Sequence, residues 1–102
     1  MKSGLKVVWT EHALDELRRT VQYLESNFSD REINRLAEKI ETVVRSISRF
    51  PDLYPESSQR QGVRRASVTK FNTLYYRTNE ERRQIEILSF FPNRKDPEEL
   101  EL

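Results

Sequence analysis

Net positive charge is concentrated in residues 57–95, where basic side chains could bind phosphate groups or carboxylates. Residues 57–95 hold nine basic and three acidic side chains, a net charge of +6, although the whole chain of 102 residues carries only +1. The candidate binding residues of this segment are Arg64, Arg65, Lys70, Arg77, Arg94 and Lys95. They create a local positive field that could attract an anionic partner. Alternatively, they are ordinary solvent-exposed residues on strands.

Other side chains that could do chemistry are sparse. The chain has no cysteine, which excludes disulfides and zinc–thiolate sites and fits a reducing cytosol. Its single histidine, His12, stands at the start of a predicted helix, a place more typical of surface or capping residues than of catalysts. The only glycines, Gly4 and Gly62, form no phosphate-binding loop, and no cluster has metal-ligand spacing. We therefore expect neither a metal nor a cofactor.

The first half of the chain predicts a strand and a pair of helices. Residues 5–9 are β-branched and aromatic, as in a strand, and Thr10 is placed to cap the helix that follows. Ser29 and Glu32 have the spacing of a capping box at the start of a second helix, which Pro51 ends. The apolar residues expected on the two helical stripes are Leu14, Leu17, Val21, Leu24 and Phe28, and then Ile33, Leu36, Ala37, Ile40, Val43, Val44, Ile47 and Phe50.

The second half predicts a loop and three strands. Residues 51–62 have loop composition, and strand-like segments follow at 63–68, 71–78 and 83–91. We expect Pro92 to end the last strand and Asp96 with Pro97 to start a short terminal turn. The order β-α-α-β-β-β predicts one α+β domain over residues 1–102, with an antiparallel helical hairpin packed on an antiparallel sheet.

Four segments, in this order, resemble the RelE/ParE superfamily of bacterial toxins from type II toxin–antitoxin (plasmid stabilisation) systems. They are VVWTEHALDELRRTVQYL, RFPDLYP, VRRASVTKFNTLYYRT and EILSFFPNRKDPEEL, and together they span nearly the whole chain. The resemblance implies the same fold and a growth inhibitor that a cognate antitoxin neutralises. Members that resemble RelE are ribosome-dependent mRNA endonucleases, whereas members that resemble ParE inhibit DNA gyrase.

Two positions favour the ParE-like branch. Cleavage of RNA by its 2′-hydroxyl needs a base, an acid and cations that stabilise the phosphorane. RelE-like enzymes often have an arginine after the first aromatic residue of the Tyr–Tyr strand, where this chain has Asn72. They also often have a C-terminal tyrosine or histidine, whereas residues 96–102 contain four carboxylates and neither of those residues. Arg94 matches an arginine of both branches.

The resemblance therefore predicts a cytoplasmic, ParE-like inhibitor that binds gyrase and an antitoxin in a hetero-oligomer. The alternatives are a ribonuclease acting on mRNA at the ribosome and an inactive relative that binds only an antitoxin. For the ribonuclease, the phosphate-stabilising residues would be Arg64, Arg65, Lys70 and Arg94. The predicted target- or antitoxin-binding residues are Arg64, Arg65, Lys70, Asn72, Tyr75, Arg77, Arg94 and Lys95. We expect one of Tyr75 and Tyr76 to be core and the other to be free for contacts.

Overall fold

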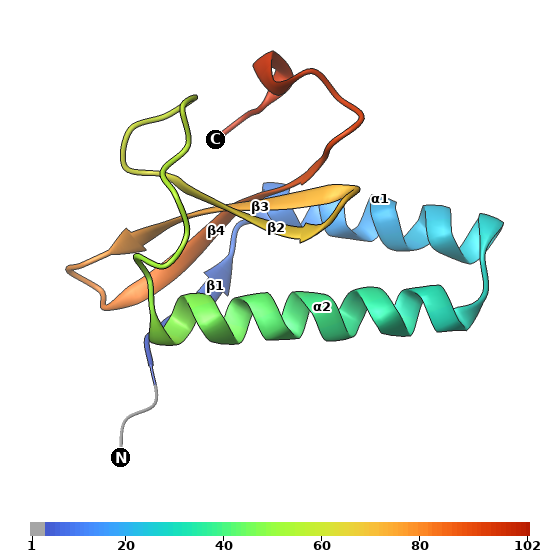
Figure 1. The fold of residues 1–102 in the computed structure, drawn as a ribbon, viewed down its shortest axis with the longest axis horizontal. Helices are drawn as coiled ribbons and strands as arrows, with labels where there is room; N and C mark the ends of the chain where they lie inside the picture. The colour runs from blue at the N-terminus through green and yellow to red at the C-terminus, as the bar shows by residue number, and fades with distance from the viewer. Residues whose placement is uncertain (1–3) are drawn as a thin grey trace.

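A helical hairpin lies against one face of a four-stranded sheet in the computed structural model, which describes residues 4–102 (Figure 1). The elements follow the predicted order. They are β1 (Lys6–Trp9), α1 (Glu11–Asn27), α2 (Asp30–Arg49), β2 (Arg64–Thr69), β3 (Asn72–Asn79), β4 (Gln84–Pro92) and the short 3₁₀ helix η1 (Pro97–Glu99). The predicted α+β fold is thus confirmed, while residues 1–3 of the predicted domain lie outside the described residues. No helix within residues 4–102 has the length and apolar character needed to cross a membrane.

The sheet is mixed, which corrects the expectation of a wholly antiparallel one. Its strand order is β1-β4-β3-β2, and β3 pairs in antiparallel fashion with both β2 and β4. β1 instead runs parallel to β4, with Trp9 opposite Ile87. Parallel neighbours need a long crossover connection, and the helical hairpin with β2 and β3 supplies one. The last strand in the chain, β4, therefore lies inside the sheet.

The predicted helix boundaries are confirmed by their capping bonds. The Thr10 hydroxyl accepts from the Ala13 amide at 3.1 Å and caps α1. At the start of α2 the Glu32 carboxylate accepts from the Ser29 amide at 3.1 Å and from the Ser29 hydroxyl at 2.6 Å. These hydrogen bonds to the charged form lower the pKa of Glu32. Pro51 follows the C-cap residue Phe50, whose amide still reaches Ser46 O.

The main core lies between the sheet and the hairpin. Residues on the inner face of β3 and β4 are fully buried there, and Ala13 of α1 and Ile47 of α2 pack against them. The fully buried sheet residues of this core are Ala66, Leu74, Tyr76, Ile85, Ile87 and Phe90. Three residues of the predicted stripes stay at the surface: Ala37 is exposed on α2, and Phe28 and Phe50, the C-cap residues of the two helices, are more than half exposed.

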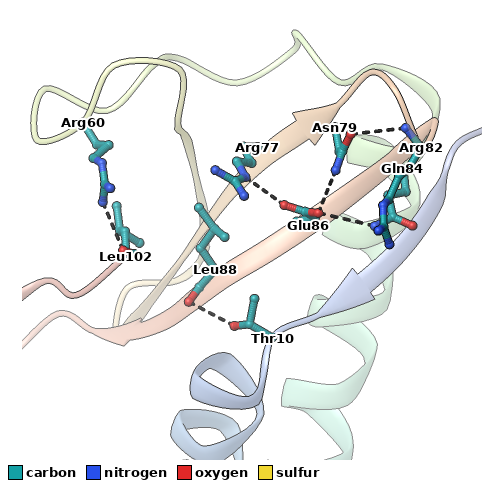
Figure 2. A network of polar contacts seen from close by, with 9 residues as sticks. All are labelled: Thr10, Arg60, Arg77, Asn79, Arg82, Gln84, Glu86, Leu88 and Leu102. Carbon is teal, nitrogen blue, oxygen red and sulfur yellow. Dashed lines mark hydrogen bonds and ion pairs between the residues drawn. The ribbon is translucent and has the colours of Figure 1, made fainter.

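A carboxylate holds the end of β4 against α1. The pairing of β3 with β4 shifts register between Tyr75 and Tyr76, leaving Leu88 as an extra residue in β4. Just beyond this bulge, Glu16 Oε1 accepts from Ser89 Oγ at 2.7 Å and from the Phe90 amide at 2.8 Å. Thr10 adds a bond from its hydroxyl to Leu88 O at 3.4 Å (Figure 2). Thr10 and Glu16 thus form hydrogen bonds with β4 beyond the residues that pair with β1.

We expect Glu16→Ala to lower the free energy of unfolding by about 2 kcal/mol, because a buried amide and a buried hydroxyl lose a charged acceptor. Urea denaturation of the purified protein measures the change. Glu25→Ala, which removes an exposed glutamate from the same helix, is the control and should leave the midpoint nearly unchanged. Equal midpoints for both variants would contradict the role given to Glu16.

Candidate functional site

Two basic segments distant in sequence meet at one edge of the sheet. Asn93, just after β4, donates from its amide to Phe71 O at 2.8 Å and from Nδ2 to Lys70 O at 3.1 Å. Its Oδ1 accepts from Thr73 Oγ1 at 2.9 Å. The turn between β2 and β3 is therefore fastened to the segment that leads into Arg94. These bonds bring together the backbone segments that carry Lys70, Arg94 and Lys95, three of the predicted binding residues. These three residues form the basic edge.

Arg94 and Lys95 lie in a turn after β4, as expected. The Lys95 amide donates to Pro92 O at 3.0 Å, and Asp96 Oδ1 accepts from the Glu98 amide at 3.0 Å to cap η1. Both basic side chains are exposed, and neither forms an ion pair within residues 4–102. They are therefore available to an acidic partner.

Arg64 and Arg65 face opposite sides of β2, as alternation along a strand predicts. Arg64 Nη1 donates to Tyr54 O at 2.7 Å, and its Nη2 lies 3.5 Å from Asp52 Oδ1. It lines a polar cavity of about 190 Å³ together with Tyr76 and Thr78. Arg65 is exposed. Of the two, Arg64 is already engaged by the loop after α2, and Arg65 is free for a partner.

Tyr75 and Tyr76 are both buried, so the expectation that one of them stays free is wrong. Tyr76 has no exposed area and donates to Pro51 O at 2.7 Å, and its burial raises its pKa to about 12. Tyr75, on the outer face, is only 7% exposed, with Phe91 in edge-to-face contact at 6.1 Å between ring centroids. Asn72 is likewise buried, at 5% exposure.

The C-terminal tail covers the outer face and explains why Tyr75 is buried. Leu100 and Leu102 pack against a small cluster formed by Val63, Tyr75 and Phe91. Arg60 Nη1 donates to Leu102 O at 3.1 Å, which fastens the tail to the loop before β2 (Figure 2). This contact was not predicted from the sequence. The alternation Leu100-Glu101-Leu102 was the available signal, since a period of two is typical of an extended segment with one apolar side.

Arg77 is paired with Glu86 across the outer face. Glu86 Oε1 accepts from Arg77 Nε at 2.8 Å, and its Oε2 accepts from Asn79 Nδ2 at 3.1 Å and Gln84 Nε2 at 3.4 Å (Figure 2). The hydrogen bonds from Asn79, and then from Arg77, hold the pKa of Glu86 below its ordinary value. The charge of Arg77 is thus largely balanced within the protein.

Within residues 4–102, neither the histidine nor the two strand tyrosines offer a free proton-transfer group at the basic edge. His12 lies on α1, where Nε2 is buried 3.5 Å from the Glu16 carboxylate, and the Tyr75 and Tyr76 phenols belong to buried clusters. The same part of the chain contains no group of three or more acidic or histidine side chains arranged to hold a metal ion. The exposed basic side chains can therefore bind anionic groups, and the exposed carboxylates that follow them in the chain are Asp96, Glu98, Glu99 and Glu101.

The structure defines a small α+β fold in which a helical hairpin packs on a four-stranded mixed sheet. The sequence model of the family described as the ParE toxin of the type II toxin–antitoxin system, parDE, matches residues 7–97. The chain belongs to this family, so it is a type II toxin. The predicted membership of the RelE/ParE superfamily is confirmed. Among curated proteins, no sequence matches this chain.

Several solved structures share the fold at low sequence identity. A structure of the chromosomal ParDE system from P. aeruginosa has a TM-score of 0.73 and 15% identity, and the match covers 89% of this chain and 98% of that one. The YoeB/ParE toxin from Agrobacterium tumefaciens has a TM-score of 0.64 and 19% identity, with 86% and 98% covered. The RelBE2 toxin–antitoxin complex from Mycobacterium tuberculosis has a TM-score of 0.61 and 20% identity, with 90% and 94% covered. At such identities the likeness establishes the fold.

Glu86 makes the stability of the protein depend on pH in a defined direction. Because its folded pKa is lowered, its contribution is fully present above the ordinary glutamate value of about 4.3 and is lost as the pH falls through the folded pKa. The difference in unfolding free energy between wild type and Glu86→Gln should therefore shrink on acidification from pH ~6. Urea titrations at stepped pH measure it, with Glu81→Gln as control for the loss of one exposed charge. A difference that stays constant with pH would rule out this linkage.

The tail contact predicts a second change in stability. Replacing both Leu100 and Leu102 by alanine should lower the unfolding free energy by about 1–2 kcal/mol, because both side chains are only partly buried against Tyr75 and Phe91. Near-ultraviolet circular dichroism should also report a changed tyrosine environment. Glu99→Ala, an exposed change in the same tail, is the control. A double variant that is as stable as wild type would mean that the tail does not cover this face in solution.

Proposed function

We propose that this toxin inhibits growth by binding DNA gyrase, without a catalytic turnover of its own. The observation that carries the proposal is the character of the basic edge. Lys70, Arg94 and Lys95 are exposed there, Arg65 is exposed near the start of β2, and Tyr75 and Tyr76 are buried. A surface with exposed cations and no free imidazole or phenol is suited to recognition of an acidic protein surface.

The ribonuclease alternative receives less support from the same residues. It requires Arg64 or Arg65 to join Lys70 and Arg94 around one phosphate. Arg64 is held by Tyr54 and Asp52, on the side of β2 opposite Arg65. Asn72, at the position where RelE-like enzymes often have arginine, is buried and carries no charge. The remaining alternative, an inactive relative that only binds an antitoxin, predicts that induced expression leaves bacterial growth unchanged.

A cognate antitoxin is the second partner that we propose. Structural neighbours include the RelBE2 toxin–antitoxin complex and a heterotetrameric YoeB–YefM toxin–antitoxin complex from Staphylococcus aureus. On this chain, Tyr23 and Phe28 form an exposed aromatic pair on α1, with ring centroids 6.0 Å apart. An amphipathic segment of an antitoxin laid across the hairpin would cover this pair and form a hetero-oligomer. Both partners would place the protein in the bacterial cytoplasm.

The purified toxin, freed of its antitoxin, should abolish supercoiling by purified gyrase at concentrations on the order of micromolar. The double variant Arg94→Ala/Lys95→Ala should need about tenfold more protein and should show weaker salt dependence, because it removes two charges that face the partner. The matched control is Arg35→Ala/Lys39→Ala, which removes two exposed charges from α2. Normal supercoiling in the presence of the wild-type toxin would refute the proposed target.

A further inference from the structure

Phe71 is the most exposed large apolar side chain within residues 4–102. It occupies the turn between β2 and β3, and 67% of its surface is accessible. Exposure of a phenylalanine ring to water is unfavourable, and nothing in the packing of the fold requires an aromatic residue at this turn. A large side chain kept in this position is therefore a candidate contact residue.

The turn that carries Phe71 is held by several bonds. The Phe71 amide donates to Thr69 Oγ1 at 3.0 Å, while Asn93 donates to the carbonyls of both Lys70 and Phe71. Thr73 fixes the Asn93 side chain from the other side. The backbone is therefore ordered before any partner arrives, so a contact made by the ring loses little conformational entropy.

One cation contacts this ring, and two more follow the residue that is bonded to its turn. Lys70 Nζ lies 5.3 Å from the centroid of the Phe71 ring, a cation–π distance. Arg94 and Lys95 follow Asn93, whose bonds fasten them to the same turn. None of the three basic residues forms an ion pair in the described part of the chain. The arrangement is a fixed aromatic side chain with unpaired positive charges beside it.

We propose that Phe71 is the anchor of target recognition and inserts into an apolar pocket of the target protein whose rim carries carboxylates. The carboxylates would meet Lys70, Arg94 and Lys95 around the buried ring. Aromatic anchors in desolvated pockets dominate the binding energy of many interfaces, and charges at the rim add orientation and speed. The inference rests on the proposed function for the identity of the target, gyrase.

A protein pocket fits these residues better than a nucleic acid does. One face of the Phe71 ring already has the Lys70 ammonium group over it, which limits stacking of a base. Four carboxylates follow Lys95 directly, at Asp96, Glu98, Glu99 and Glu101, and all are exposed. A continuous phosphate backbone along this edge would meet that negative charge, whereas carboxylates at discrete points of a pocket rim need not.

The test measures binding of purified toxin variants to purified gyrase and, in parallel, to a single-stranded oligonucleotide of mixed sequence. Phe71→Ala should weaken gyrase binding about thirtyfold, whereas Phe71→Trp should retain it. Phe50→Ala is the matched control, since it removes an equally exposed phenylalanine, 62% accessible, from the end of α2. Thermal unfolding of each variant verifies the fold.

The outcomes separate this inference from the proposed function. Wild-type and Phe71→Ala proteins that bind gyrase equally well would overturn the anchor and leave the gyrase target standing. A wild type that does not bind gyrase would overturn both. Binding to the oligonucleotide that Phe71→Ala abolishes, with no binding to gyrase, would also overturn both and assign the residue to nucleic acid. A loss of gyrase binding specific to Phe71→Ala supports the inference.

Discussion

The bonds that Glu16 makes to Ser89 and Phe90 determine where the final part of the chain lies. β4 is flanked by β1 and β3, but β1 ends opposite Ile87, before the last residues of β4. From there on, the Glu16 carboxylate receives the Phe90 amide and the Ser89 hydroxyl. A buried carboxylate with two donors fixes geometry strongly, because an unsatisfied partner would be costly. Asn93, Arg94 and Lys95 come directly after this fixed segment, so their position follows from it.

The structure divides the basic residues into two groups with different consequences for function. Arg64 and Arg77 are engaged by Tyr54, Asp52 and Glu86, and contribute to the loop and the outer face of the sheet. Lys70, Arg94 and Lys95 remain exposed beside Phe71, at an edge held by Asn93. Local net charge alone would treat both groups as equivalent. The hydrogen bonds and ion pairs occupy the first group, whereas the second group, like Arg65, is free to attract a partner.

Local signals in the sequence predicted the helices and strands, whereas contacts between residues far apart in the chain could not be predicted. Thr10, Ser29 with Glu32, and Pro51 mark helix ends through interactions within a few residues, and all were found. Glu16 could not be recognised, because its partners lie 73 and 74 residues further along the chain. The burial of Tyr75 depends likewise on Leu100 and Leu102. For the same reason, the sequence could not show which of Arg64 and Arg65 is bonded to the loop after α2.

We propose that the basic edge binds its target without cleaving it, and mapping of mRNA ends on translating ribosomes distinguishes binding from cleavage. Purified toxin is added to an active translation reaction, and the 5′ ends of the mRNA are mapped by primer extension. Binding without cleavage predicts the same mRNA 5′ ends with and without toxin. Cuts in phase with codons that appear with wild-type protein and vanish with Arg94→Ala would show that the exposed cations act on a phosphate, and would contradict it.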